Sequence, residues 1–132
     1  MARHLWLLLT VCCLVMPAMT GATNAQQEPV WQIGETIRSQ LFDAQRLLFT
    51  VDRAGNPAAV YAEAQTLTEQ AQALYTGQLQ QTTAMYAPSA HEAVLQALVD
   101  AQIAIENEDE VAFAAARGRV WTGLLWASHD VV

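Results

Sequence analysis

The chain has 132 residues, of which 53% are apolar and 14% charged, and its formal net charge is −7. This length fits one domain, and the apolar content excludes a disordered polyelectrolyte. Lysine is absent, so six arginines oppose 13 acidic residues. Nucleic-acid binding needs a basic surface and docking on anionic lipid needs a polybasic patch, so the charge argues against both. An acidic surface can attract cations, but it also keeps a protein soluble.

The first 25 residues have the anatomy of a secretory signal peptide. A short basic start precedes an apolar run over residues 5–16, and small residues then lead to Ala25. We therefore predict a signal peptide over residues 1–25, cleavage before Gln26, and export to the periplasm or cell envelope. An uncleaved anchor is the alternative, although the run is shorter than the roughly 20 apolar residues that a transmembrane helix needs.

Both cysteines, Cys12 and Cys13, fall inside this leading segment. The predicted mature chain therefore has no thiol. This excludes a disulfide, a zinc–thiolate site, a cysteine nucleophile and covalent haem attachment through C-x-x-C-H.

Residues 26–132 are predicted to form an all-α domain, an alanine-rich bundle of about four antiparallel helices. Four stretches carry apolar residues at alternating steps of three and four, the period of an amphipathic helix. No stretch alternates with period two, so strands are not expected. Short loops between helices of similar length favour antiparallel neighbours. The predicted stripes are Ile37, Leu41, Ala44, Leu48 and Val51; Val60, Ala64, Leu67, Ala71 and Leu74; Val94, Leu98, Ala101 and Ile105; and Val111, Ala114, Gly118, Trp121 and Leu125.

Turn-forming residues separate these stretches. Gly55 is expected to end the first helix in a left-handed conformation. Asn56 is expected to cap the second helix and Pro57 to occupy its first turn. Gly77 is a candidate end of the second helix. A short helical extension and a loop around Pro88 are expected next.

The start of the third helix contains a histidine and a glutamate that invite a metal-site interpretation. Ser89 and Glu92 have the spacing of a capping box. His91 and Glu92 are adjacent, whereas di-iron bundles need E-x-x-H, so we interpret Glu92 as a cap. Asn107 or Asp109 is expected to start the fourth helix.

One dense acidic cluster precedes the last helix. Hard cations such as iron(III) or calcium favour carboxylate oxygens, so the cluster is a weak candidate for a metal site. It lacks the ligand pattern of an EF-hand. Carboxylates at a helix start are also favoured by the helix dipole without any ligand. The candidate residues are Asp100, Glu106, Glu108, Asp109 and Glu110.

No pattern supports catalysis. Nucleophile turns and Gly-rich phosphate loops are absent, and His129 and Asp130 are expected to be solvated polar residues. We therefore do not expect an enzyme. The aromatic residues of the domain are expected to be core or interface anchors rather than a ligand cage. They are Trp31, Trp121, Trp126, Phe42, Phe49 and Phe113.

The last helix, "AAARGRVWTGLLWASHDVV" over residues 114–132, resembles a known family. It is similar to the extracytoplasmic N-terminal region of some bacterial members of the high-affinity iron permease family, and "IRSQLFDAQ" over residues 37–45 is similar to the first helix of such regions. The resemblance implies a helical domain that precedes a membrane-spanning permease. The residues that carry it are Arg117, Gly118, Val120, Trp121, Leu124, Leu125 and Ser128.

The chain also departs from that family. The permease moves iron with R-E-x-x-E motifs on transmembrane helices, but the chain has no such motif and no spanning apolar stretch after residue 25. We therefore expect a leading fragment, incomplete at its C-terminus, of a protein in the plasma membrane. Its expected role is to present or sense iron for uptake, with a permease part of the same or a neighbouring chain as partner. The alternative is a free-standing exported interaction module without metal binding.

Overall fold

The computed structural model describes residues 28–130, and these form an all-α bundle, as the sequence predicts. No strand occurs over this range. The predicted signal peptide, its cleavage site and both cysteines lie outside the described residues. The elements are α1 (Val30–Leu48), the 3₁₀ turn η1 (Val51–Arg53), α2 (Pro57–Leu74), the π-helical turn η2 (Tyr75–Leu79), α3 (Gln80–Tyr86), α4 (Pro88–Glu106) and α5 (Glu110–Asp130).

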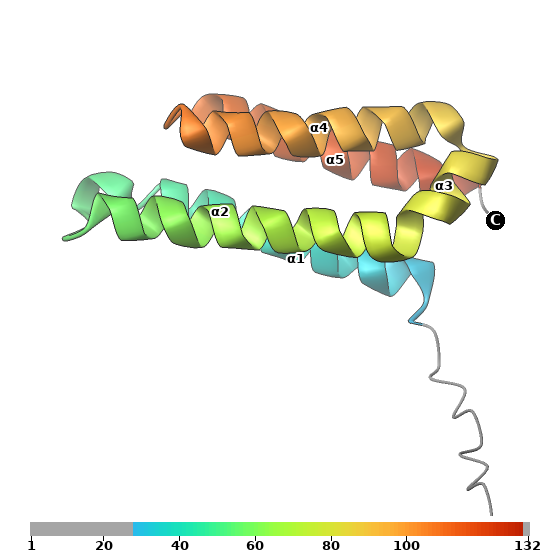
Figure 1. The fold of residues 1–132 in the computed structure, drawn as a ribbon, viewed down its shortest axis with the longest axis horizontal. Coiled ribbons are helices and arrows are strands. Elements are labelled where there is room, and N and C mark those ends of the chain that lie inside the picture. The colour runs from blue at the N-terminus through green and yellow to red at the C-terminus, as the bar shows by residue number, and fades with distance from the viewer. Residues whose placement is uncertain (1–27, 131–132) are drawn as a thin grey trace, which may run out of the picture.

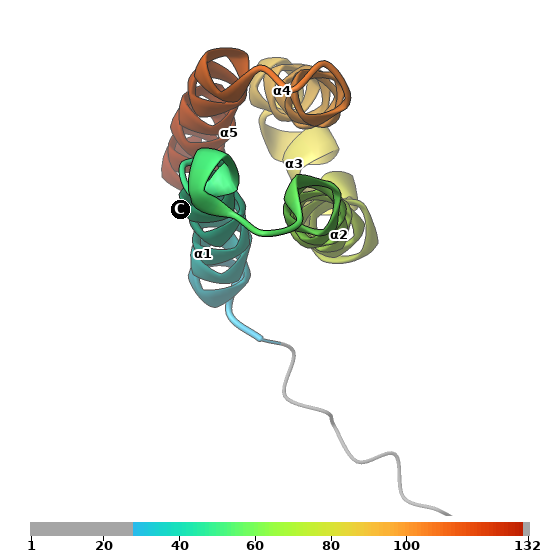
Figure 2. The ribbon, with the colours of Figure 1, turned by 90° about the vertical axis from the view of Figure 1, so that its left-hand side faces the viewer.

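The four long helices make two antiparallel hairpins that pack on each other. Helix α1 pairs with α2 and α4 pairs with α5, while α1 also contacts α5 and α2 contacts α4. Viewed along their axes, the four helices stand at the corners of a square (Figure 2). The short helix α3 crosses from the first hairpin to the second (Figure 1). This is the up-and-down arrangement that short connections favour.

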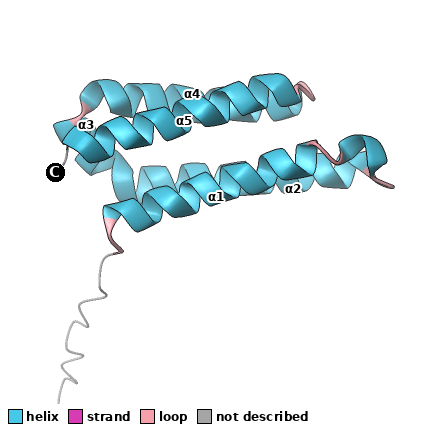
Figure 3. Cartoon of the chain, turned by 180° about the vertical axis from the view of Figure 1, so that it is seen from behind, coloured by secondary structure: helices cyan, strands magenta, loops and turns pink. Residues whose placement is uncertain are grey.

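The two ends of the bundle are formed by different elements. Helix α1 begins, α5 ends and α3 crosses over at one end of the bundle (Figure 1). The α1–α2 and α4–α5 connections both lie at the other end (Figure 3). The two described termini of the chain therefore emerge at the same end of the molecule.

The core is built from the stripes predicted for α1 and α4. Ile37, Leu41, Ala44 and Leu48 are buried on α1, and Ile33 extends this stripe by one turn. Val51 lies beyond the helix, in η1. The predicted α4 stripe is buried throughout, and alanines flank it so that neighbouring helices can approach closely. The buried residues of α4 are Ala90, Val94, Ala97, Leu98, Ala101, Ala104 and Ile105.

Helix α2 buries a narrower face than its pattern predicts. Ala64 and Ala71 are buried, but Leu67 and Leu74 are only partly covered. The buried surface includes Thr68, whose hydroxyl donates to the Ala64 carbonyl at 2.8 Å. This bond satisfies the hydroxyl within its own helix, so a polar side chain can lie in the core.

The predicted helix ends were right in part. Asn56 caps α2 by accepting a hydrogen bond from the Ala59 N–H at 3.3 Å, and Pro57 occupies the first turn. Gly55 does not adopt the left-handed conformation that we expected of it. Helix α1 ends earlier, at Leu48, and the 3₁₀ turn makes the connection instead.

The prediction that Gly77 ends the second helix is wrong. Helical structure continues through the π turn into α3, so Gly77 lies inside a helix. The π turn holds one residue more than an ordinary α-helical turn. Pro88 occupies the first position of α4 rather than a loop, as suits its fixed φ angle. The predicted capping box is also wrong, because Ala87 precedes α4 and no side chain caps the helix.

The buried face predicted for α5 is wrong. Val111 is 75% exposed and Leu125 is 47% exposed. A different stripe faces the core, because this helix is apolar on more than one side and periodicity alone did not select the buried side. The buried residues of α5 are Phe113, Ala116, Val120, Gly123, Leu124 and Ala127.

Candidate functional site

The carboxylates of the predicted acidic cluster lie mainly in the α4–α5 connection. Glu106 is the last residue of α4, Glu110 is the first residue of α5, and Glu108 and Asp109 lie between them. All four side chains are exposed. Asp52 of η1 belongs to the α1–α2 connection at the same end of the bundle (Figure 1). We call these five residues the acidic end.

The backbone of this connection explains why its residues are placed as they are. Glu108 has a φ of 55°, the left-handed conformation that often follows a helix. Its N–H donates to the Ile105 carbonyl at 3.0 Å, and the Asp109 N–H donates to the Ala104 carbonyl at 2.8 Å. These two bonds define a Schellman motif that closes α4.

The next helix starts at once. The Asp109 side chain accepts a hydrogen bond from the Ala112 N–H at 2.8 Å, which makes it the N-cap of α5 and confirms one of the two predicted starts. Glu110 occupies the first turn, where the helix dipole favours a negative charge. Two carboxylates of the cluster therefore have structural reasons for their positions that need no ligand.

Asp100 is separated from the rest of the cluster. It lies six residues before Glu106 on α4, which corresponds to about 9 Å along the helix. Its carboxylate makes an ion pair with the Arg119 guanidinium at 2.9 Å and accepts a hydrogen bond from the Gln96 amide at 2.9 Å. This residue therefore connects α4 to α5.

The candidate metal ligands do not form a ready coordination site. Over residues 28–130, no group of three or more His, Cys, Asp or Glu side chains could hold a metal ion. What the connections share is an electrostatic effect on Tyr61 of α2. Burial raises the pKa of Tyr61, and Glu108, Asp52 and Glu110 raise it further. Carboxylates from both connections therefore contribute to the negative potential at Tyr61.

The opposite end of the bundle carries an apolar pocket of about 210 Å³. Helix α1, the η2–α3 segment and α5 form its walls. Glu35 is the one carboxylate among its lining residues, and Arg38 neutralises it through an ion pair at 2.8 Å. The apolar side chains that line the pocket are Val30, Trp31, Leu79, Trp121, Leu124, Leu125 and Ala127.

Large apolar side chains at this end of the bundle face solvent, and two of them, Trp31 and Leu125, line the pocket. Trp31 is 68% exposed and Trp126 is 62% exposed. Met85 and Tyr86 of α3 are similarly exposed, as is Leu125 of α5 to a lesser degree. We call these five residues the aromatic end. Of the aromatics expected to be anchors, Phe113 is in the core, whereas Trp31, Phe42, Phe49 and Trp126 are exposed and Trp121 is half-buried.

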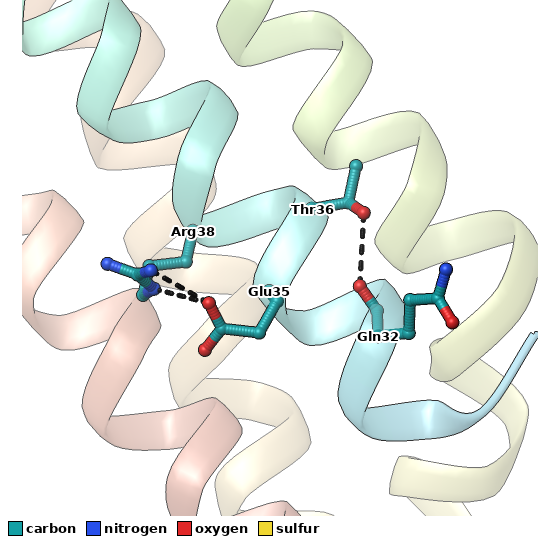
Figure 4. A network of polar contacts seen from close by, with 4 residues as sticks. All are labelled: Gln32, Glu35, Thr36 and Arg38. Carbon is teal, nitrogen blue, oxygen red and sulfur yellow. Dashed lines mark hydrogen bonds and ion pairs between the residues drawn. The ribbon is translucent and has the colours of Figure 1, made fainter.

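Two polar contacts on α1 lie near the pocket, which Glu35 lines (Figure 4). The Arg38 guanidinium is held by Glu35 and lies 5.4 Å from the ring centroid of Trp121 on α5, within range of a cation–π contact. Nearby, the Thr36 hydroxyl donates to the Gln32 carbonyl at 3.0 Å. The Arg38 contact therefore connects α1 to Trp121 of α5, whereas the Thr36 bond lies within α1.

A tyrosine–histidine pair, in which Tyr75 is buried and His91 half-buried, was not predicted from the sequence. The Tyr75 hydroxyl and Nδ1 of His91 are 2.9 Å apart, and the two rings stack with centroids 5.9 Å apart. Tyr75 lies at the first position of the π turn and is fully buried. The two residues are 16 apart in sequence, so only the crossover through α3 brings them together.

The helices over residues 28–130 include none that is long and apolar enough to cross a membrane. The architecture defines the class of the domain, which is an up-and-down all-α bundle. The sequence model of the iron permease FTR1 N-terminal domain matches residues 26–132. The chain belongs to this family. Its role is therefore related to iron permeases and iron transport, in a family of membrane transporters rather than enzymes.

Comparison with curated proteins gives no significant match, and none of the solved structures matches the chain.

Proposed function

We propose that this chain is the exported helical domain of an iron permease protein and that it presents iron cations for uptake. The observation that carries the proposal is the family match over residues 26–132. In this proposal the domain is not the transport channel. The permease part that it serves belongs to the same or a neighbouring chain in the plasma membrane.

The export part of the proposal is supported by the sequence. The family match begins at Gln26, the residue after the predicted cleavage site. The preceding residues have the basic, apolar and small-residue order of a signal peptide. Mass spectrometry of the exported protein tests this part: a mature N-terminus at Gln26 supports cleavage, and a retained residue 1 contradicts it.

The iron-presenting part is supported by the acidic end. Glu106, Glu108 and Glu110 are exposed, and they share this end with Asp52, whose neighbour Arg53 supplies one opposing charge. Because no three-ligand site is formed there, we propose weak attraction rather than tight coordination. Such a field raises the local concentration of cations and their rate of encounter.

The test is a calorimetric titration with iron(II) under anaerobic conditions, with iron(III) in a separate series. The variant Glu106→Gln, Glu108→Gln, Glu110→Gln removes three charges at the acidic end. We expect weak binding by the unaltered domain, reduced severalfold in the variant and weakened by salt. An iron affinity that is unchanged in this variant would contradict a role for the acidic end.

The matched control removes three charges from the helices instead. Glu63, Glu69 and Glu92 are exposed on α2 and α4, so changing them to Gln gives the same net charge. If both triple variants lose binding equally, net charge alone is responsible and the acidic end has no special role.

The second candidate function is an exported interaction module that binds no metal. The exposed side chains of the aromatic end favour it, because exposed aromatic patches mark interaction sites. Iron binding that is undetectable by calorimetry, together with a stable oligomer in solution, would support this candidate over iron presentation.

A further inference from the structure

We propose that the apolar pocket between α1, the η2–α3 segment and α5 is a binding site for a small neutral phenol. The pocket measures about 210 Å³. An apolar cavity of about 150 Å³ takes one benzene ring, so this pocket has room for a ring with small substituents. Leu79 and Leu124 are buried at its inner side, whereas Trp31 is 68% exposed. Two indole rings, those of Trp31 and Trp121, can pack against a flat ligand.

Gly34 leaves open space along one wall of this pocket. A glycine inside a helix lets another group approach the backbone closely. At Gly123 that group is Val94, but no atom of the described chain lies within 4 Å of a Cβ atom added at Gly34. Because Gly34 lines the pocket, a ligand ring can occupy this space.

The hydroxyl groups that line the pocket are mainly hydrogen-bond acceptors. The Thr83 hydroxyl donates to the Leu79 carbonyl at 2.8 Å. The Ser128 hydroxyl donates to the Leu125 carbonyl, also at 2.8 Å. Since each hydroxyl has one proton, both can only accept a hydrogen bond from a ligand. The pocket therefore favours a ligand that donates one.

Glu35 supplies the strongest acceptor of the pocket. Two nitrogens of Arg38, Nε at 2.9 Å and Nη2 at 2.8 Å, both contact Oε2 of Glu35 (Figure 4). The other carboxylate oxygen, Oε1, accepts no hydrogen bond from the described part of the chain. It can therefore accept the O–H of a phenol, and a hydrogen bond to a carboxylate is stronger than one between neutral groups.

The charges around the pocket favour a neutral ligand. A carboxylate or phenolate would be repelled by Glu35 and by the net charge of −7. An ammonium group would be repelled by the Arg38 guanidinium, which lies 5.4 Å from the ring centroid of Trp121. A neutral phenol avoids both repulsions. The acidic end lies at the other end of the bundle (Figure 1), so phenol binding and iron binding are measured independently.

The experiment is a calorimetric titration of the full chain with three probes that share one ring. The probes are p-cresol, 4-methylanisole, in which a methyl group replaces the hydroxyl proton, and the anion p-toluate. We expect p-cresol to bind roughly tenfold more tightly than 4-methylanisole, because the latter cannot donate to a charged acceptor. We expect p-toluate not to bind. Equal affinity for p-cresol and 4-methylanisole, or measurable binding of p-toluate, would overturn the ligand class.

Two further outcomes test whether a free phenol is the occupant. Absence of p-cresol binding at millimolar concentration would overturn the site. Tighter binding of N-acetyltyrosinamide than of p-cresol would assign the pocket to a tyrosine side chain of another protein, which overturns a free small molecule as its ligand.

A pair of glycine variants locates the binding. Gly34→Leu places a side chain in the pocket, and Gly118→Leu is the control, because Gly118 is exposed on α5 and does not line the pocket. A Cβ atom at either position meets nothing within 4 Å, and circular dichroism verifies the helix content. We expect Gly34→Leu to weaken p-cresol binding at least tenfold and Gly118→Leu to leave it unchanged. Unchanged binding by Gly34→Leu would overturn the location.

A second pair of variants tests the acceptor. Glu35→Gln removes the charge, and Asp43→Asn is the control, because Asp43 makes the same i,i+3 ion pair with Arg46 but does not line the pocket. We expect Glu35→Gln to weaken p-cresol severalfold and to leave 4-methylanisole unchanged, and Asp43→Asn to change neither. Equal weakening by the two variants would overturn the role of Glu35 as the hydrogen-bond acceptor.

Discussion

Gly118 and Gly123 lie five residues apart on α5 and face different surroundings. A Cβ atom added at Gly123 would lie 2.5 Å from Cγ2 of Val94, whereas nothing lies within 4 Å of one added at Gly118. Val94 is fully buried and its branched side chain is stiff. The close approach of α5 to α4 therefore depends on Gly123, while Gly118 has no such steric role.

The pair gives a prediction with an internal control. We expect Gly123→Ala to destabilise the domain, because overpacking costs about 1–3 kcal/mol against a gain in helix propensity of about 1 kcal/mol. We expect Gly118→Ala to stabilise it by about 0.5–1 kcal/mol. Urea unfolding followed by circular dichroism measures both. Equal stabilisation by the two changes would contradict the packing of α5 on Val94.

Tyr75 and His91 give a second prediction at the residue scale. Burial raises the pKa of Tyr75, although the Thr83 hydroxyl opposes this in part. The stability that neutral Tyr75 contributes is therefore fully present below the unfolded-state pKa of about 10 and is lost as the pH rises through the folded-state value. Tyr75→Phe should lower the free energy of unfolding by about 1 kcal/mol at neutral pH. The variant should also lose less stability than the unaltered chain as the pH rises above about 10.

Denaturant unfolding at a series of pH values measures this effect. Tyr86→Phe is the control, because Tyr86 is 60% exposed and the change should leave stability nearly constant. An alkaline slope that is the same in Tyr75→Phe and in the unaltered chain would show that Tyr75 does not carry the effect.

At the scale of elements, the α4–α5 connection combines one helix end and one helix start within a few residues. Glu108 adopts the left-handed conformation of the Schellman motif, where glycine is the usual residue. Asp109 then caps α5. The acidic residues of this turn differ in role, because Asp109 is held by the backbone while the side chains of Glu106, Glu108 and Glu110 are exposed to solvent.

Glu108→Gly tests the backbone conformation of this turn. A left-handed conformation costs a residue with a Cβ about 1–2 kcal/mol. Glycine avoids that cost but loses more entropy on folding, so we expect a net stabilisation of up to about 1 kcal/mol. Thermal unfolding measures the change. A lower stability would contradict the positive φ angle at this position.

Asp109→Ala tests the helix start. Losing the hydrogen bond to the Ala112 N–H should cost about 1 kcal/mol. Asp109→Asn should cost much less, because asparagine is an equally good cap. If both substitutions were equally destabilising, the charge rather than the cap would be the important property.

The elements also show where sequence reasoning succeeds. The stripes of α1 and α4 were predicted because each has one continuous apolar side, and the helix starts at Asn56 and Asp109 were predicted from cap chemistry. The buried face of α5 was not, since Val111 and Leu125 fit the helical period as well as the residues that are buried. No pattern in the sequence predicts the π turn at Tyr75, so the prediction that Gly77 ends the second helix is wrong.

At the scale of the whole molecule, the two ends of the bundle carry different kinds of side chain. The five carboxylates of the acidic end lie where the two hairpins turn, with the exposed Phe49 and Val111 beside them, whereas Trp31, Tyr86 and Trp126 lie at the end where α1 begins and α5 ends. The acidic residues were identified in sequence, but their arrangement depends on the antiparallel pairing that puts η1 and the α4–α5 connection at the same end of the bundle (Figure 3). The aromatic end could not be predicted, because α1, α3 and α5 meet there only in the folded bundle.

In the function that we propose, this iron permease-family domain supports iron uptake through its acidic end. The most direct measurement is radioactive iron uptake by cells that depend on the protein, at limiting iron. We compare Glu106→Gln, Glu108→Gln, Glu110→Gln with the helix variant Glu63→Gln, Glu69→Gln, Glu92→Gln at equal protein levels. We predict that the first variant takes up iron severalfold more slowly and that the second resembles the unaltered protein. Equal uptake by all three proteins would contradict the claim.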